Sequence, residues 1–369
     1  MSLKVDQETC FSCSLCADCC TNPWGVLVHP DKRAAIEAQP WPEPPGELFE
    51  APVQGLSALK KHADTNRCVL LDEDNLCRLH KLFGEESKPK MCQRFPYLHT
   101  ASDEKVWVTA SYGCRAVSEG RGVPLEEHRE GLERLYHQDL EETSAEADTL
   151  YPLRPGVDWR TEELDAALDQ VDWGQTVFDT MAALARLAWD VAPNSAEAEG
   201  TLRYAMALTL YSDLVGEGFW GRLRGVFTLP QALAFSLRYQ SRLLGQEVDL
   251  QQVRAHPGVL PDEGHALLQR WLRSRVRSRR VFRNAPHAAA GITRLLIHAN
   301  LVLLFARAQG PDAITGERVR EALRTVERYI ANQEVVNTLT RLDPRLKAAW
   351  ENPQVAWAAV DFFRSASQG

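Results

Sequence analysis

Nine cysteines, all in the first third of this 369-residue chain, are the residues with the clearest capacity for chemistry. Thiolates are soft ligands that suit zinc and iron rather than calcium or magnesium. An odd number at tight spacing, in a chain without an export signal, predicts metal ligands rather than disulfides. The candidate ligands are Cys10, Cys13, Cys16, Cys19, Cys20, Cys68, Cys77, Cys92 and Cys114.

The first five cysteines leave two kinds of metal site open. Cysteines separated by two residues let a chain wrap a compact cluster, and bacterial ferredoxins use a related run. Paired cysteines with this spacing also form zinc knuckles. The first run holds more thiols than one zinc ion needs, which favours an iron–sulfur cluster, with 4Fe-4S as the expected type. The complete set could equally hold two zinc ions.

The later cysteines extend the pattern into a recognisable order: a CxxCxxCC run, two single cysteines, and a KPxxCxxFP segment. This order resembles the YkgJ-type cysteine-cluster family, whose members are described as chelating zinc or iron. The resemblance covers roughly residues 10–115, and it implies a metal-binding module there. Cys10 lies outside the common pattern. The matching residues are Cys13, Cys16, Cys19, Cys20, Cys68, Cys77, Cys92, Phe95 and Pro96.

A second resemblance concerns the longer chain. Trp24, the segment from Cys68 to His80, and residues 83–86 are similar to the flagellin lysine-N-methylase group, in which a long helical region follows the cysteines. This similarity implies a protein-lysine N-methyltransferase using S-adenosylmethionine on a protein substrate. The sequence contains neither a glycine-rich nucleotide-binding turn nor a radical-type Cys-x3-Cys-x2-Cys run. Two functions therefore stay open: a metal-binding module whose helices recognise a protein partner, and a methylase.

Four arginines are candidates for binding a cofactor or another anionic group. Arg94 and Arg115 lie close to cysteines in sequence and would place positive charge near an anionic cluster. Arg275 and Arg279 fall among apolar residues of an arginine-rich helical segment, where a guanidinium needs a carboxylate or an anionic ligand. We expect them to line an internal polar cavity, with internal salt bridges as the alternative. Arg270, Arg273, Arg277 and Arg280 share the opposite face, which is expected to be solvated.

The elements that must position these residues differ on the two sides of residue 120. Residues 1–120 are irregular, with short strands expected at 68–71 and 106–109, and would depend on bound metal for cohesion. Residues 121–369 show helical periodicity at 175–192, 201–215 and 291–308, the last apolar on nearly all sides, and Thr315 is expected to cap a further helix. The fold class is therefore mainly α: a small, metal-stapled cysteine-rich domain followed by an all-α domain.

Composition excludes several classes of protein. A formal net charge of −8 argues against a nucleic-acid binder. No uninterrupted apolar run reaches the roughly 18–20 residues that span a bilayer, and residues 1–8 do not resemble a secretory signal. We expect a cytoplasmic protein without a membrane partner. The sequence does not indicate its oligomeric state.

Overall fold

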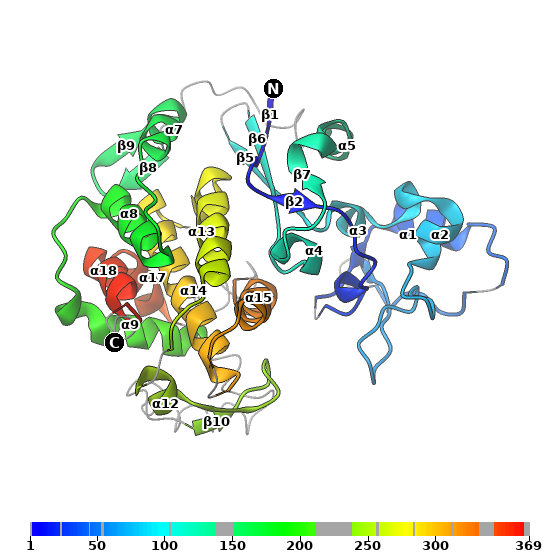
Figure 1. Cartoon of the computed structure of the whole chain (residues 1–369). Helices are drawn as coiled ribbons and strands as arrows, with labels where there is room; N and C mark the ends of the chain where they lie inside the picture. Colours follow the sequence, from blue (N-terminus) through cyan, green and yellow to red (C-terminus); the bar gives the residue numbers. More distant parts are fainter. Residues whose placement is uncertain are drawn as a thin grey trace.

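The computed structural model describes residues 2–22, 24–43, 45–52, 55–102, 105–137, 151–210, 238–255, 258–282, 285–310, 313–331 and 343–364. The chain is mainly α-helical, as the periodicity predicts, with a few short strands in small sheets. In Figure 1 a lobe of short elements, drawn blue to cyan, lies at one side of a larger helical body drawn green to red.

A three-stranded sheet connects the lobe to the body. Its order is β1 (Ser2–Val5), β6 (Lys105–Ala110) and β5 (Tyr97–Ser102), with β1 parallel to β6 and β5 antiparallel to it. The expected strand at 106–109 is the centre of this sheet. Asp6, just after β1, accepts hydrogen bonds from Thr109 (2.7 Å) and from Ser274 (2.5 Å) of α13 (Asp262–Arg277), which anchors the sheet to the body.

The cysteine-rich lobe is built from very short elements and has a small core of its own. Seven buried apolar residues form that core, all between Val28 and Leu79. Its elements are β2 (Cys10–Phe11), η1 (Asp18–Cys20), β3 (Leu27–Val28), α1 (Pro30–Glu37), β4 (Ser57–Ala58), α2 (Arg78–Phe83), η2 (Glu85–Ser87) and α3 (Lys90–Arg94).

Residues after the sheet pack with the helical body instead. The side chains of Tyr112, Val117 and Leu125 are buried in the same large hydrophobic core as the later helices. These residues lie in or beside α4 (Arg115–Ser118), β7 (Val123–Pro124) and η3 (Leu125–His128), whereas α5 (Arg129–Leu135) packs its buried Leu132 against the three-stranded sheet. The division of the chain near residue 120 remains a prediction.

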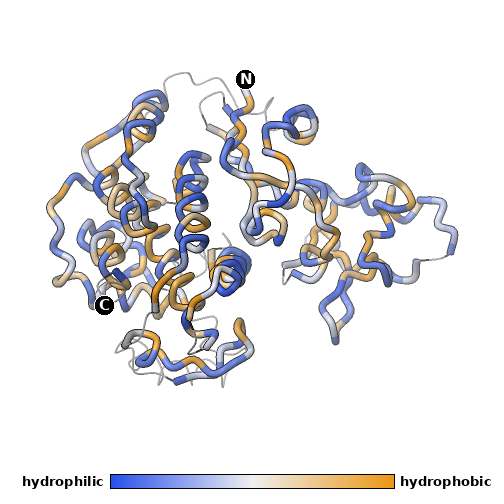
Figure 2. The backbone as a smooth tube through the Cα atoms, viewed as in Figure 1, coloured by the Kyte–Doolittle hydropathy of each residue, from blue (hydrophilic) through white to orange (hydrophobic). Residues whose placement is uncertain are grey.

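The body surrounds one buried helix, α14 (Ala288–Ala308), in which residues 288–306 are all buried. It is long and apolar enough to cross a membrane by length and composition, but its apolar window is 100% buried inside the fold. In Figure 2 the helices at the centre of the body carry stretches coloured as hydrophobic, and further hydrophobic stretches lie in the sheet and in the lobe. The remaining body elements are β8 (Tyr151–Arg154), β9 (Val157–Trp159), α7 (Thr161–Asp169), α8 (Val177–Trp189), α9 (Ser195–Thr209), β10 (Arg238–Gln240), β11 (Glu247–Asp249), α12 (Leu250–Ala255), α13 (Asp262–Arg277), η4 (Arg280–Phe282), α15 (Gly316–Thr325), η5 (Val326–Ile330), α17 (Pro344–Trp350) and α18 (Pro353–Asp361).

Most of the expected helices are confirmed, with small changes at their ends. Helix α8 covers the centre of the 175–192 segment. The helix predicted at 201–215 corresponds to the second part of α9, and its last residues, 211–215, lie outside the described part of the chain. Thr315 caps α15 by accepting a hydrogen bond from the backbone amide of Arg318. The expected strand at 68–71 is reduced to single bridges at its two ends, Lys61 with Cys68 and Leu71 with Cys77.

Candidate metal centre

Backbone contacts bring cysteines that are far apart in sequence to the same side of the lobe. The amide of Cys68 donates to the carbonyl of Cys20 at 3.0 Å. The amide of Arg78 donates to the carbonyl of Leu70 at 2.8 Å, which folds the tight turn between Cys68 and Cys77 back on itself. The cysteine run, Cys68 and Cys77 are therefore held together by main-chain bonds, independently of side-chain rotamers.

Tight turns in the run aim successive thiols at one region. Leu15 and Ala17 have positive φ angles of 55° and 61°, which reverse the chain before the single turn of η1. The sulfur atoms of Cys19 and Cys20 then lie 3.9 Å apart. A backbone that turns this sharply can return several thiols of a CxxCxxCC run to one centre.

The fourth segment of the centre is α3, which carries Cys92 in its middle. Pro89 precedes the first turn, where its missing amide proton costs nothing, and Pro96 prevents the helix from continuing. Gln93 donates to the carbonyls of Glu86 (3.0 Å) and Lys88 (2.7 Å), which fixes this short helix against η2. The KPxxCxxFP segment is thus a rigid carrier for one thiol.

The effects of the thiols on one another's pKa values indicate which of them lie near one another. The pKa of Cys92 is raised to about 12, mainly by burial and further by the nearby Cys68, Cys77 and Cys19. The pKa of Cys20 is raised by its hydrogen bond with Cys19, by burial, and by Cys19, Cys68 and Cys77. These five thiols, which we call the main thiol group, come from four separate segments of the chain.

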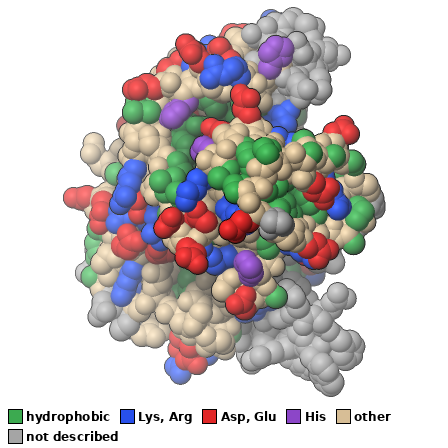
Figure 3. All heavy atoms as spheres, turned by 90° about the vertical axis from the view of Figure 1, so that its right-hand side faces the viewer, with side chains coloured by type: hydrophobic (Ala, Val, Ile, Leu, Met, Phe, Trp, Pro, Cys, Tyr) green, Lys and Arg blue, Asp and Glu red, His purple; other side chains and the backbone are tan. Residues whose placement is uncertain are grey.

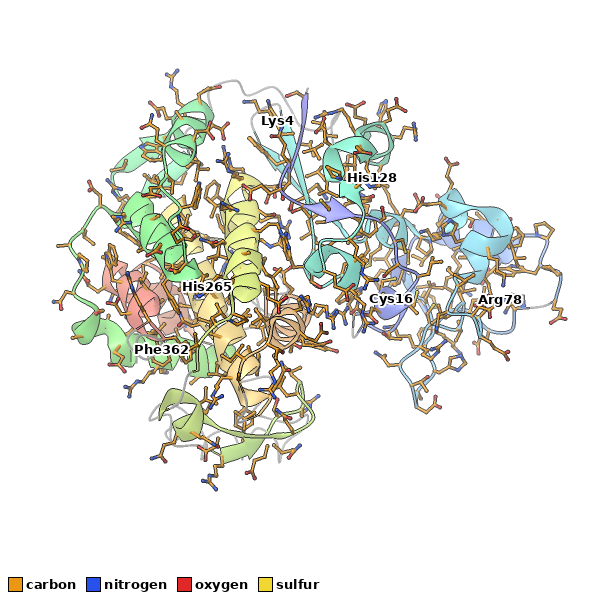
Figure 4. The ribbon with its side chains drawn as sticks, in the orientation of Figure 1. Lys4, Cys16, Arg78, His128, His265 and Phe362 are labelled. Carbon is orange, nitrogen blue, oxygen red and sulfur yellow. The ribbon has the colours of Figure 1, made fainter. Side chains whose placement is uncertain are left out.

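A smaller thiol group lies where the run meets the body. Cys114 directly precedes α4 and is 9% exposed. Burial raises the pKa of Cys114 to about 11, with a further contribution from Cys16 and Cys19, and outweighs the opposing effect of the nearby backbone amides of Val117 and Ala116. Figure 4 places Cys16 at the inner edge of the lobe, facing the body, whereas Arg78 lies on the far side.

Cys10 is placed differently from the other eight cysteines. It lies on β2 opposite Pro124 of β7, before the first turn of the run. The structure therefore positions it by strand pairing rather than by the turns that bring the other thiols together.

Lys61, Lys88 and the hydrogen-bonded pair Cys19–Cys20 influence the electrostatics of the main thiol group. Lys61 interacts electrostatically with Cys68, Cys20 and Cys92, and burial lowers its pKa. The hydrogen bond from Cys20, assisted by Lys88, lowers the pKa of Cys19 to about 7 although burial opposes this shift. The sequence argument missed both lysines because neither adjoins a cysteine in the chain.

The donor set fits zinc or iron, although the side chains do not yet enclose an ion. Among the described residues, no group of three or more His, Cys, Asp or Glu side chains is arranged to hold a metal ion as it stands. The convergent donors are nonetheless all sulfur, the ligand type of structural zinc and iron–sulfur sites. High thiol pKa values mean that a bound cation must displace protons here.

Of the four predicted cofactor-binding arginines, Arg115 lies closest to the cysteine run. Its Nε is 3.5 Å from Asp18, the residue before Cys19, and its side chain is 44% exposed. Arg328 of η5 bonds the same carboxylate at 3.1 Å and the carbonyl of Gly113 at 2.6 Å. Asp18 therefore connects the cysteine run to the last part of the body, a link the sequence did not suggest.

The other three arginines lie at the boundary between lobe and body or inside the body. Arg94 stacks over the ring of Tyr136 and, with Arg275, lines a cavity of about 860 Å³. Arg275 pairs with Glu327, whereas Arg279 pairs with Asp165, lies 4.4 Å from the ring centre of Trp107 and is not among the residues that line the cavity. The internal salt bridges given as the alternative are thus present for both.

The arginines expected to share a solvated face have more specific positions. Arg273 and Arg277 form ion pairs with Glu8, and Arg277 also pairs with Asp169. Helix α13 ends at Arg277, so Arg280 lies on η4 and lines the cavity instead of continuing that face. The expectation of a solvated face is wrong for Arg280, because the helical period stops before it.

Comparison with known proteins supports the cysteine pattern. Residues 12–115 match the CxxCxxCC family model, described as "Putative zinc- or iron-chelating domain", so this segment carries that domain and Cys10 falls outside the match. The uncharacterized protein MJ0939 of Methanocaldococcus jannaschii is 24% identical over 190 residues. The aligned region covers 49% of this chain and 62% of that protein, less than two thirds of its length. No solved structure matches the chain.

Proposed function

We propose that the protein holds iron, as a 4Fe-4S cluster, or zinc through the thiolates of its CxxCxxCC domain. The observation that carries this proposal is the convergence of the main thiol group from four segments of the chain. Cysteines buried only for packing would not need to lie near one another. Such a metal would supply cross-links that the lobe's small apolar core cannot provide.

The proposed ligands fall into two sets with different roles. The main thiol group, Cys19, Cys20, Cys68, Cys77 and Cys92, would hold the metal. Cys13, Cys16 and Cys114 would complete a cluster or hold a second ion at the side facing the body. Lys61 and Lys88 would offset part of the negative charge of several thiolates. The iron–sulfur reading is preferred because the thiols outnumber those that a single zinc ion requires.

Anaerobic purification followed by elemental analysis and an absorption spectrum tests the metal. A brown protein with iron, sulfide and absorption near ~400 nm would support the cluster. A colourless protein with stoichiometric zinc would refute the iron–sulfur preference and retain the metal site. Protein that is free of both metals after purification and after anaerobic reconstitution would contradict the proposal altogether.

Cysteine variants test the ligands. We expect Cys68→Ser and Cys92→Ser each to lose most of the bound metal, because each removes a thiol from the main thiol group. Cys10→Ser is the comparison variant and is expected to retain more metal, since Cys10 lies outside both the turns and the family match. Equal metal loss in all three variants would argue for a single ligand set that includes Cys10.

We further propose that the helical body recognises a protein partner or substrate, with protein-lysine N-methylation as the alternative activity. The family match ends at residue 115, so this part of the proposal depends on the sequence resemblance alone. Incubation of metal-loaded protein with S-adenosylmethionine and candidate protein substrates, followed by intact mass measurement, separates the two functions. Added methyl masses would favour the methylase, and unmodified substrates would favour the binding module.

A further inference from the structure

One polar side chain near the main thiol group is buried without a hydrogen-bond partner. Asn22 follows Cys20 by two residues and is 2% exposed. Within the described part of the chain, neither the nitrogen nor the oxygen of its side-chain amide makes a hydrogen bond. Buried amides are nearly always paired, because the loss of their hydrogen bonds to water is costly. An unpaired amide at this position therefore points to a partner that the site acquires when it binds a ligand.

The main chain at Asn22 is fixed by hydrogen bonds from a distant segment. Its carbonyl accepts one hydrogen bond from the ammonium group of Lys61 and another from the side chain of Asn66 at 3.3 Å. Asn66 also donates to the carbonyl of Thr21 at 2.8 Å. These bonds attach the end of the cysteine run to residues 61–66 and hold in place the backbone that carries the unpaired amide.

The lysine that holds this backbone also lies beside the thiols. Lys61 pairs with Cys68 in a short bridge and interacts electrostatically with the thiols of Cys20, Cys68 and Cys92. Asn22 is therefore buried between the same two chain segments that bring Cys20 and Cys68 together. Sulfur atoms that bind a metal carry negative charge and accept hydrogen bonds from N–H groups, which orient them. A metal-bound thiolate beside Asn22 would be such an acceptor.

We propose that the side-chain amide of Asn22 donates a hydrogen bond to a thiolate of the main thiol group when that thiolate binds a metal. A neutral thiol is only a weak acceptor, which explains why the amide is unpaired beside the metal-free thiols. The hydrogen bond orients the thiolate and spreads its negative charge. Asn22 is thus a positioning residue and not a ligand. This inference rests on the proposed metal site.

Replacement of Asn22 by leucine tests this role, because leucine has a similar volume and no hydrogen-bond donor. Asn66→Gly is the matched control. It removes a neighbouring amide that donates to backbone carbonyls, and glycine tolerates the positive φ angle of 54° at this position. The probe is cobalt(II), added to the reduced full-length protein without oxygen, because the absorption of its thiolate complexes reports both metal binding and the charge on sulfur.

We expect Asn22→Leu to bind cobalt about 10-fold or more weakly than the wild type in competition with a chelator, the loss typical of residues that hydrogen-bond to metal ligands. The sulfur-to-cobalt absorption should also move to longer wavelength, because a thiolate without its N–H donor gives up an electron more easily. Asn66→Gly should keep the wavelength of the wild type. If the purified protein holds an iron–sulfur cluster, the reduction potential of Asn22→Leu should be lower than that of the wild type and of Asn66→Gly.

The absorption wavelength or the reduction potential decides the outcome. A wild-type value in Asn22→Leu would overturn the inference even if the affinity fell, because looser packing weakens metal binding without changing the charge on sulfur. The same shift in Asn66→Gly would also overturn it, by assigning the effect to the backbone. Wild-type protein that binds neither cobalt, zinc nor iron would instead refute the proposed metal site. If Asn22→Leu fails to fold, Asn22→Ala removes the same donor with a smaller side chain and is measured in its place.

Discussion

At the residue scale, the chemistry of this protein depends on charges removed from water. Burial and the neighbouring thiols raise the pKa values of Cys20 and Cys92, so a cation that binds these two thiols must displace their protons. Inside the body, Arg275 and Glu327 are each 7% exposed and satisfy one another. Burial raises the pKa of Glu327, but the ion pair with Arg275 and the hydrogen bond from Trp271 lower it by more, so the net shift is downward.

Removing the charge of Glu327 should be strongly destabilising. We expect Glu327→Gln to lower the free energy of unfolding by about 3–5 kcal/mol, because Arg275 would be left buried without its carboxylate. Glu317→Gln is the control, since Glu317 pairs with Arg320 at the surface and its loss should change stability by about 0.5 kcal/mol or less. Urea denaturation followed by circular dichroism gives both values. Similar losses in the two variants would contradict the buried-pair argument.

Buried His298 should make the protein sensitive to mild acid. Burial and Arg294 lower its pKa from 6.5 to about 3. Between these two pH values the unfolded chain therefore binds a proton at His298 and the folded chain does not. Stability from this residue is complete above pH 6.5 and is lost as the pH falls toward 3, by about 2 kcal/mol at pH 5. Denaturation at pH 7 and pH 5 measures the loss. The His298→Gln variant should show a smaller difference between the two pH values, and an unchanged difference would assign the acid sensitivity elsewhere.

At the scale of elements, short segments position the sites and close helix packing forms the body. Helix α3 is only five residues long, yet it contributes Cys92 to the proposed metal centre and three residues to the cavity. It keeps its place through prolines on both sides and through Gln93. In the body, α14 approaches η4 so closely that only glycine fits at position 291, where a Cβ atom would lie 1.9 Å from the carbonyl oxygen of Val281.

The contact at Gly291 predicts opposite effects for two glycine substitutions. We expect Gly291→Ala to destabilise the protein by about 1–3 kcal/mol, because backbone rather than a flexible side chain must move. In Gly200→Ala the new methyl group meets nothing within 4 Å, and helix propensity should raise stability by up to about 1 kcal/mol. Thermal denaturation compares the two. Equal melting temperatures would mean that the α14–η4 packing relaxes without cost.

At the scale of the whole molecule, the two parts of the chain are stabilised by different forces. The body has one extensive hydrophobic core around α14, whereas the core of the lobe contains seven buried apolar residues. Figure 3, which faces the lobe, shows hydrophobic side chains gathered near the centre of the view among scattered acidic and basic ones. A domain with so little core depends on other cross-links for its stability.

Metal removal should therefore unfold the lobe and spare the body. After treatment with a chelator under reducing conditions, we expect trypsin to cleave within residues 12–96 while the helices around α14 remain protected. Mass spectrometry of the fragments identifies the cleavage sites. Cys68→Ser and Cys92→Ser without chelator should give the same fragments. Identical digestion patterns with and without metal would show that the lobe is stable by itself.

The sequence by itself determined the mainly helical fold, a buried helix at 291–308 and the resemblance of the cysteine-rich segment, because periodicity and ligand spacing are local properties of a chain. It also identified Arg275 as a buried cation. Only the tertiary structure decided which thiols converge, that Lys61, Lys88 and Asp18 accompany them, and that Arg280 turns into a cavity with Arg94 and Arg294. Those relations join residues up to about 300 positions apart, such as Asp18 and Arg328, and depend on where helices end and which faces pack together. Contacts between residues so far apart in sequence cannot be predicted from their spacing along the chain.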